Sequence, residues 1–579
     1  MAAFVSCVGA ALTPHRRGVA ACDARSSTFL GPAVSARVAT PGAPSMPGVV
    51  VATASRDLPI DAQTNKPLVE VAITDGSTMT QSSRADGWLE SVRGFQSTSS
   101  SSSSLTGAAA ATVQALGAEA DHVLSTLPPP LREESWRFTD LNALYKMRFG
   151  AAAAGSDADV AADAARSPTA ASLSGAVMAD AAATVVFVDG VYRPELSTVG
   201  ASMGETGVYV GTLGGYEGDA SDTLLELLSA KSCETDVSLN VFTALNGAAV
   251  AAGSTEVGVV VVPAGVAVDG AVQVLFSTTP GGTKETSTAA FPRLLVVAGA
   301  NASVDVVEQY MGTEVGAGVG AGATAATGAA AAAVGAAAAS HFFSDSLTTV
   351  HVGDGARVRH TLVNEVPVDA VALSHVYART FKDATYELLT LVATGAVGRV
   401  TIGAELLAPG GHVDSTSLCL SDGKQVNDLH SRIAHSAPLC TSNQLHKNVA
   451  AGRGRSIFAG KVVVDKVAQK TDSKQLCRSL LLSNRAQVDA MPVLLINADD
   501  VKCTHGATVS DLNEDELFYC QSRGLSATDA RFLLIKGFAG EVVDKVRYEP
   551  IQERTTELVR MILDNIDLRD SQFATHSSI

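Results

Sequence analysis

The sequence predicts a mainly β protein whose core is a solenoid of short strands, flanked by helical segments at both ends. Short Val-, Ile- and Leu-rich runs of strand length follow one another through residues 184–509, and Gly-, Pro- or Asn-containing turns separate many of them. We predict no helical segment between these runs. Ala, Gly and Val dominate the composition and aromatic residues make up only 5% of it, which suits regular stacking of small and β-branched side chains.

The number of strand-like runs favours a solenoid over a single sandwich, because each coil of a solenoid packs only on its neighbours. No tight hexapeptide repeat is present, which argues against a left-handed β-helix of the acyltransferase type. The runs span residues 185–188, 258–262, 272–276, 294–297, 304–307, 347–352, 358–363, 372–377, 387–392, 399–404, 412–418, 456–464 and 493–496.

Residues 1–56 have the composition of an organelle transit peptide rather than of a folded domain. Their basic residues are Arg16, Arg17, Arg25, Arg37 and Arg56, and Asp23 is their only acid. A disordered cytosolic tail is the alternative, and composition alone does not separate plastid from mitochondrion. We interpret residues 57–183 as a helical N-terminal domain that contains a flexible Ser-rich linker at 97–104.

An Ala- and Gly-rich stretch at residues 312–340 is predicted to be a low-complexity insertion in the 184–509 core. It is long enough to cross a bilayer, but Ala and Gly give little drive to enter lipid. The sequence therefore predicts no membrane contact.

Residues 510–579 are predicted to form a small helical domain. Asn513 and Ser526 are suitable N-caps for helices that begin at 514 and 527, and a third helix is expected over about 551–566. The apolar face predicted for the second helix consists of Ala530, Leu533, Leu534, Phe538, Val542 and Val546.

Charge and motifs exclude several function classes. A net charge of −17 argues against nucleic-acid binding, which needs a basic face. The eight cysteines follow no disulfide pattern in this long chain, which indicates a reducing compartment. The sequence has neither a Gly-x-Ser-x-Gly elbow nor a Gly-x-x-x-x-Gly-Lys-Ser/Thr loop. We therefore predict no enzyme activity, and ATP hydrolysis would have to come from another chain.

Cys503 and His505 are the candidate metal ligands. Residues i and i+2 of a strand point to the same face, so an extended segment would place this thiol and imidazole side by side. Both groups bind soft to borderline metals. A closed zinc site needs four ligands and no further pair lies nearby, so the residues alone predict half a metal site or one completed by a partner. The alternative is a buried thiol beside a satisfied histidine.

The other Cys and His residues carry weaker signals. Cys477 is a secondary candidate, although a core cysteine is the favoured interpretation. Cys419 and Cys440 are predicted to be core. The sequence places His430, His435 and His446 in a polar loop region, where a metal cluster is disfavoured.

The C-terminal half resembles the SufD subunits of the SUF iron–sulfur cluster assembly system, members of the SufB/SufD family. The resemblance covers roughly residues 85–550, with gaps. Its most specific part comprises AQKTDSKQ, SLLLSNRAQVDAMP, ADDVKCTHGATV, LFYCQSRGLS and ARFLLIKGFAGEVV. Weaker matches are GRSIFAGKVVV, VVFVDGVYRPELS, ESWRFTDL and the Trp88-Leu89-Glu90 run. Where SufB proteins would carry Glu-His-Glu-Ala-Thr-like and Gln-Cys-Asp-Ser runs, this chain has Thr504–Thr508 and Gln475–Arg478, which favours SufD.

This resemblance implies a right-handed parallel β-helix between N- and C-terminal helical domains. It implies a non-catalytic scaffold that pairs with SufB through the last coils and binds SufC, an ABC-type ATPase, through the C-terminal helices. Cys503 and His505 would lie near the SufB interface, so that a transient iron–sulfur cluster or iron is shared with SufB and no cofactor is held alone. The resemblance also favours the plastid stroma, because SUF systems of photosynthetic eukaryotes are plastidial.

Two other functions remain open on sequence grounds. One is a SufB-like subunit that holds a cluster by itself. The other is a β-solenoid enzyme acting on polysaccharide, which is disfavoured because acids are dispersed and aromatic platforms for sugars are few.

Overall fold

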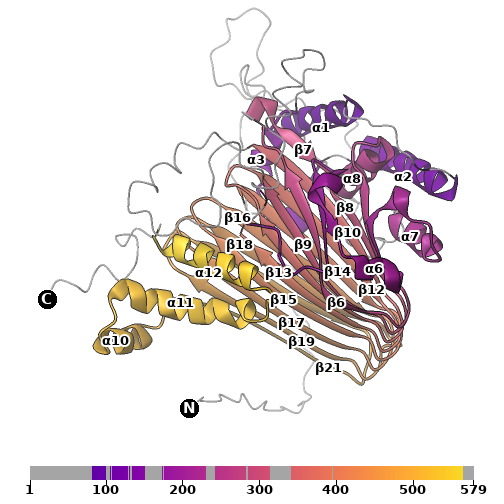
Figure 1. The fold of residues 1–579 in the computed structure, drawn as a ribbon. Helices are drawn as coiled ribbons and strands as arrows, with labels where there is room; N and C mark the ends of the chain where they lie inside the picture. The colour runs from indigo at the N-terminus through magenta and orange to yellow at the C-terminus, as the bar shows by residue number, and fades with distance from the viewer. Residues whose placement is uncertain are drawn as a thin grey trace, which may run out of the picture. The chain divides into compact units, whose positions relative to one another are not determined.

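A computed structural model describes residues 81–98, 105, 107–127, 129–130, 134–149, 173, 175–229, 241–281, 284–312, 341–393 and 395–564. The predicted transit segment 1–56, linker residues 99–104 and insertion residues 313–340 lie outside the described residues. The core is a parallel β-solenoid of about seven turns with helices in the N- and C-terminal regions (Figure 1), which confirms the predicted fold class.

Two long sheets form the walls of the solenoid. The first sheet runs in the order β2 (Val191–Tyr192), β1 (Ala183–Val188), β6 (Ala267–Thr278), β9 (Ser303–Gly312), β11 (Arg357–Glu365), β13 (Thr385–Val392), β15 (His412–Ser421), β17 (Thr441–Ala450), β19 (Asp472–Leu481) and β21 (Lys502–Ser510), with β3 (Thr198–Val199) beside β1. The second runs β20 (Gln487–Ile496), β18 (Arg455–Val464), β16 (Val426–His435), β14 (Val397–Leu406), β12 (Val371–Thr380), β10 (Phe342–Val352), β8 (Arg293–Ala298), β5 (Val257–Val262) and β4 (Tyr209–Thr212), with β7 (Thr288–Ala290) beside β10.

Each coil contributes one strand to each sheet, and equivalent strands pair in parallel from coil to coil. Left-handed backbone at one corner of the coils turns the chain from one sheet to the other. Asn301, Gly355, Asp383 and Gly410 have φ values of 56°, 66°, 52° and 82° at these corners. Gly, Asn and Asp tolerate this conformation best. At Gly410 a Cβ would also lie 2.0 Å from Asp383 Oδ1 of the preceding corner, so the stacking of corners requires glycine there.

The N-terminal helices cover the outer face of the second sheet (Figure 1). Trp88 of α1 packs edge-on against Phe343 of β10, with ring centroids 5.7 Å apart, and against Phe242 of α8 at 5.9 Å. Arg399 of β14 lies 3.9 Å from the ring of Trp136 and donates to Asp428 Oδ2 at 2.8 Å. The helical elements of this region are α1 (Gln81–Thr98), α2 (Gly107–Thr126), η1 (Glu134–Trp136), α3 (Asn142–Tyr145), η2 (Pro194–Leu196), α6 (Ala201–Thr206), η3 (Leu213–Gly215), α7 (Ser221–Leu228), α8 (Val241–Ala251) and η5 (Lys284–Thr286).

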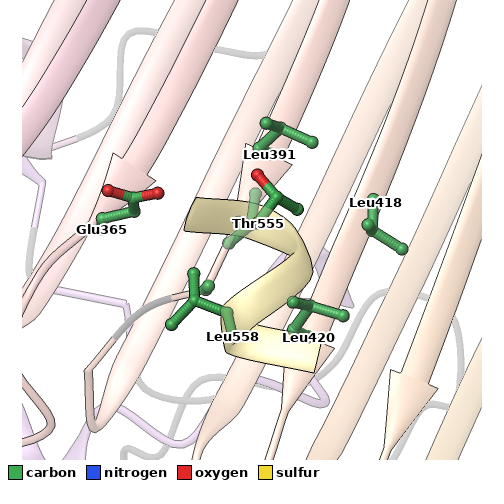
Figure 2. A pocket seen from close by; sticks show the side chains of 8 residues that line it. Glu365, Leu391, Leu418, Leu420, Thr555 and Leu558 are labelled. Carbon is green, nitrogen blue, oxygen red and sulfur yellow. The ribbon is translucent and has the colours of Figure 1, made fainter. Parts of the chain in front are cut away.

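The C-terminal helices α10 (Glu514–Ser522), α11 (Ala527–Val543) and α12 (Glu549–Asp564) belong to the first-sheet side of the solenoid. Figure 2 shows α12 above the sheet, where Thr555 and Leu558 line a small pocket with Leu391, Leu418 and Glu365. Burial raises the pKa of Glu365, and Arg554, whose Nε lies 3.4 Å away, opposes that shift.

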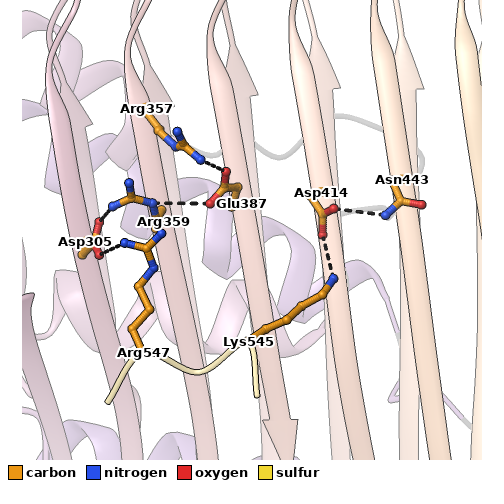
Figure 3. A network of polar contacts seen from close by, with 8 residues as sticks. All are labelled: Asp305, Arg357, Arg359, Glu387, Asp414, Asn443, Lys545 and Arg547. Carbon is orange, nitrogen blue, oxygen red and sulfur yellow. Dashed lines mark hydrogen bonds and ion pairs between the residues drawn. The ribbon is translucent and has the colours of Figure 1, made fainter. Parts of the chain in front are cut away.

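Ion pairs fasten the connection between α11 and α12 to the same sheet (Figure 3). Arg547 reaches Asp305 of β9 at 3.7 Å, and Lys545 reaches Asp414 of β15 at 4.0 Å. Asp305 also pairs with Arg359, which in turn lies 3.5 Å from Glu387. These pairs are partly exposed, so each stabilises the contact only modestly, while the apolar faces of α11 and α12 supply most of the packing.

Three sequence predictions about elements are wrong. Helices α6, α7 and α8 lie between β3 and β5, where no helix was predicted. Nearly every residue of α8 is buried, so it lacks the polar face that reveals an amphipathic helix. Strands β16 and β17 occupy the predicted polar loop that contains His430, His435 and His446. On α11, Leu533 is 51% exposed, whereas Ile535, Ala539 and Val543 are buried instead.

Other local predictions are confirmed. The side chains of Asn513 and Ser526 accept hydrogen bonds from the backbone N–H groups of Asp515 and Asp529, as expected for N-caps. Cys419 and Cys440 are buried. Across the described residues, no helix combines the length and apolar character needed to span a membrane.

Candidate functional site

Cys503 and His505 lie on β21, the terminal strand of the first sheet. The parallel register pairs Cys503 with Ser473 and His505 with Gln475 of β19. Ser473 and Gln475 are buried, and in-register residues of parallel strands point to the same face. Both candidate ligands therefore lie on the same face of β21, as their spacing predicted, and that face is turned to the solenoid interior. They are less buried than their neighbours because no further coil covers them within the described residues.

The surroundings of Cys503 favour the protonated thiol. Cys503 packs against the apolar cluster that contains Val462 and Val464 of β18 and Ala468 of the turn that follows it. This burial raises the pKa of the thiol, the backbone at Ser473 opposes the shift by hydrogen bonding, and the nearby Asp472 charge adds to it. Because the thiolate is the metal-binding form, a metal arriving at this position would have to displace the proton.

Cys477, the secondary candidate, lies deeper in the same interior. It is fully buried on β19 and pairs in register with Ala507. Burial raises the pKa of its thiol to about 11, and its Sγ lies 3.9 Å from Ser479 Oγ. A buried thiol with a raised pKa is a poor nucleophile and a poor ligand. The geometry supports the interpretation of Cys477 as a core residue.

The three histidines that the sequence places in a polar loop, His430, His435 and His446, do not form a cluster. His435 and His446 point into the interior, where His435 Nε2 lies 2.9 Å from Ser442 Oγ and His446 Nδ1 lies 2.6 Å from Ser417 Oγ. His430 faces the other side and pairs with Asp428 at 3.0 Å. Within the part of the chain that the structure describes, no group of three or more His, Cys, Asp and Glu side chains could hold a metal ion. Cys503 and His505 thus remain an incomplete ligand pair.

The last coil presents an open edge around this pair. Among the described strands, β20 and β21 each have a partner on one side only. Their backbone groups on the other side are available to a further strand. Val493, Leu495, Ile496 and Val509 are 39–47% exposed on these two strands. Pro492 interrupts the donors of β20, as is typical of an edge strand.

The polar interior of the last coils was not foreseen from the sequence. Its members are Ser415, Ser417, Ser442, Gln444, His446, Asn448, Ser473, Gln475 and Ser479, all buried. Pairs such as Ser417–His446 and Gln444–Gln475 lie 29 and 31 residues apart in the chain. A search for polar strand-length segments recurring at that spacing would have found them.

Comparisons with known proteins agree with this architecture. Residues 317–538 match the family model described as "SUF system FeS cluster assembly, SufBD core domain". An iron–sulfur cluster assembly SufBD family protein of Synechocystis is 31% identical over 440 residues, which cover 76% of this chain and 88% of the relative. The chloroplastic protein ABCI7 of Arabidopsis thaliana is 29% identical over 63% of this chain and 71% of its own length.

A third relative, the iron–sulfur cluster assembly protein SufD of Escherichia coli, is 33% identical over 217 residues, which cover 37% of this chain and 50% of that protein. The cyanobacterial relative is matched over most of its length, and the family model covers the last coils and the first C-terminal helices. The chain therefore belongs to the SufB/SufD family of SUF iron–sulfur cluster assembly proteins.

Proposed function

We propose that this chain is a non-catalytic scaffold subunit of the SUF complex. It pairs with SufB through its last solenoid coil, shares a cluster-forming site with SufB, and binds the SufC ATPase through its C-terminal helices. The observation that carries the proposal is the incomplete Cys503–His505 pair on an open sheet edge. Two ligands leave a metal under-coordinated, and an unpaired edge offers backbone hydrogen bonds to a second subunit.

The apolar side chains of the last coil support pairing with SufB. Val493 and Leu495 of β20 are exposed, as is Val509 of β21. A second solenoid placed against this edge would cover them and would bring its own ligands next to Cys503. The iron–sulfur cluster is cargo of such an assembly, formed between the subunits and passed on.

The outer end of the C-terminal helices supports a contact with SufC. Phe518 and Tyr519 of α10 are 75% and 59% exposed, and Leu525 and Leu533 are 39% and 51% exposed. Phe538 instead faces the solenoid, where Lys447 Nζ lies 4.4 Å from its ring. The docking surface is therefore assigned to Phe518, Tyr519, Leu525 and Leu533, which we call the α10 patch, and not to Phe538.

The same proposal places the mature protein in the plastid stroma. Its support is the name of the chloroplastic Arabidopsis relative and the acid-poor composition of residues 1–56. N-terminal sequencing of the protein isolated from plastids should give a start near residues 45–60, and an intact Met1 there would contradict cleavage.

The decisive test of the shared site is the iron and sulfide content of a purified complex with SufB and SufC that carries His505→Ala. We expect subunit ratios to stay normal and cluster content to fall strongly, because removing an edge imidazole opens little core. His122→Ala, an exposed histidine of α2, is the matched control. Full cluster content in the His505 variant would refute the site, and loss of the complex would assign His505 a structural role.

Reconstitution of the isolated chain separates this function from that of a self-sufficient SufB-like subunit. Because this chain supplies two ligands, anaerobic reconstitution with iron and sulfide should leave it without a stable cluster unless SufB is present. A stoichiometric cluster on the isolated chain would favour the SufB-like function instead.

The SufC contact is tested with Phe518→Asp in pull-down experiments. An exposed substitution should change stability by no more than about 0.5 kcal/mol but place a charge in the α10 patch. Val368→Asp, another highly exposed apolar residue but on the solenoid between β11 and β12, is the control. Undiminished SufC binding by the Phe518 variant would contradict the assignment.

A further inference from the structure

A row of polar side chains crosses the interior of the last coils and ends at His505. Ser415 of β15, Gln444 of β17, Gln475 of β19 and His505 of β21 occupy equivalent register positions in successive coils. The first three are buried. His505 is thus the next side chain in a stack that begins three coils deeper.

The two glutamines form a hydrogen-bonded ladder with a direction. Gln475 Nε2 donates to Gln444 Oε1 at 2.8 Å, and Gln444 Nε2 donates to Ser431 Oγ at 2.6 Å. The nitrogen and oxygen of a planar amide point away from each other. Since Gln475 Nε2 donates to Gln444, Gln475 Oε1 points away from that hydrogen bond and is left for another donor.

Gln475 Oε1 is a buried acceptor without a hydrogen-bond partner among the described residues. The whole side chain is only 2% exposed. Leaving such an acceptor unmet carries the full cost of removing it from water. An imidazole N–H in the neighbouring register position is the donor that would remove this cost, and His505 is the residue at that position.

The opposite wall leaves space for this amide. Gly460 of β18 lies across from Gln475, and a Cβ there would come within 2.2 Å of Gln475 Nε2. Glycine at this position lets the glutamine lie flat in the interior. The amide is therefore held by its hydrogen bond to Gln444 and has room beside Gly460, while its oxygen has no partner among the described residues.

We propose that Gln475 is a positioning residue for the Cys503–His505 site, an inference that rests on the proposed function. Gln475 Oε1 accepts the N–H of one His505 ring nitrogen. This hydrogen bond holds the imidazole in one tautomer and directs the other nitrogen, with its lone pair, toward the open edge beside Cys503. Metal-binding histidines are commonly oriented by such a carbonyl acceptor behind the ring.

Nitrogen NMR of the histidine side chains in the full-length chain tests the hydrogen bond without any metal. His505→Ala assigns the signals, and a pH of about 8.5 keeps an ordinary imidazole neutral. We expect His505 to show one protonated and one unprotonated nitrogen in the wild-type chain. In Gln475→Leu both nitrogens should move toward an averaged position, because neither tautomer is favoured. Gln475→Glu, which keeps an acceptor, should restore the single tautomer.

Ser479→Ala is the structural control, because Ser479 is equally buried on the same strand but pairs in register with Val509. Its His505 signals should match those of the wild-type chain. Averaged His505 nitrogens in the wild-type chain would overturn the proposal even if Gln475→Leu does not fold. Unchanged signals in Gln475→Leu, or the same averaging in Ser479→Ala, would overturn it as well.

Cluster content of the assembled complex then connects the hydrogen bond to the site. Loss of an orienting partner typically weakens metal affinity by roughly 10–100-fold, so the Gln475→Leu complex should lose iron and sulfide while keeping its subunit ratio. Full content in that complex would overturn the positioning role. If His505→Ala itself leaves the content intact, the shared-site function fails, whereas the tautomer measurement still decides whether Gln475 orients His505.

Discussion

The early and late coils of the solenoid share one backbone plan, but their interiors differ in polarity: apolar side chains predominate on β6 and β9, beside the buried Glu308, and polar ones on β17 and β19. Val272, Val274 and Phe276 of β6 and Val304 and Val306 of β9 form one apolar cluster. Five coils later Ser442, Gln444 and His446 of β17 lie over Ser473 and Gln475 of β19, and all of these are buried as well. The coil shape therefore depends on the backbone ladders and the corner turns. The interior can hold apolar or polar side chains, provided that the polar groups form hydrogen bonds with one another.

The two interiors differ in how much they stabilise the fold. Burying a large apolar side chain contributes about 1.5–3 kcal/mol, whereas a typical buried hydrogen bond contributes a net of about 1 kcal/mol. The first coils are also covered by the N-terminal helices, whereas the outer edge of the last coil is open among the described residues. We expect the last coils to open locally more often than the first, and amide hydrogen exchange would show this gradient.

The largest effect on stability is expected from shortening a side chain of the apolar interior. Phe276 stacks on Phe187 and Tyr310, with ring centroids 5.0 and 5.2 Å apart. Phe276→Ala should lower the free energy of unfolding by about 3–5 kcal/mol, measured by urea denaturation. Tyr519→Ala, an exposed aromatic on α10, should leave it within about 0.5 kcal/mol. Equal losses from the two variants would contradict the view that the first coils hold the fold together.

Acid should destabilise the polar interior selectively. Burial lowers the pKa of His435 and His446 from 6.5 to about 4. Between pH 4 and 6.5 the unfolded chain binds more protons than the folded chain. The stabilisation by the two neutral imidazoles is therefore fully present above about pH 6.5 and is lost as the pH falls toward 4. Each histidine contributes on the order of 3 kcal/mol across that window.

Urea denaturation at pH 7 and pH 4.5 measures this dependence. His446→Gln keeps hydrogen-bonding capacity but removes one titrating group, so its stability should fall less steeply with acid than that of the wild-type chain. His122→Gln, an exposed position on α2, should retain the wild-type slope. An unchanged slope in the His446 variant would mean that this imidazole does not titrate with unfolding.

The smallest effect on stability is expected from removing a single hydroxyl group of the polar interior. Ser442 Oγ lies 2.8 Å from Ser473 Oγ and 2.9 Å from His435 Nε2. Ser442→Ala should cost about 1 kcal/mol, because it leaves its partners unpaired. Adding Ser473→Ala should cost little more, since the second change removes one of those unpaired groups. Additive losses in the double variant would show that the two hydroxyls act independently.

The sequence predicts the solenoid and singles out Cys503 and His505 as candidate ligands, but it does not reveal the polar interior around them. The strand at 456–464 was predicted because apolar residues follow one another there, and β18 covers that segment. The segments of β16 and β17 look like loop in the sequence because polar residues stand at their interior positions, among them Asn427, Ser431, Ser442 and Gln444. The period-2 alternation of apolar and polar residues that indicates a strand disappears when both faces are polar.

The remaining differences depend on contacts between segments that lie far apart in the sequence. Gln475 carries no local motif, and its relation to His505 exists only through the pairing of β19 with β21. The apolar face of α11 was misplaced at Leu533 because a single helix does not reveal how it rotates against a sheet. The N-caps Asn513 and Ser526 were predictable, since capping is decided within one turn of helix.

Pro492 affects whether other copies of the chain can pair with the open edge of β20 in a crowded cell. A flat, fully donating edge would let one molecule add to the next without limit and grow into fibres. Pro492 stands in β20 opposite Gly460 and removes one N–H from that row. A strand of another molecule that adds to this edge therefore finds no donor at Pro492. The missing N–H makes unlimited growth along this edge less favourable.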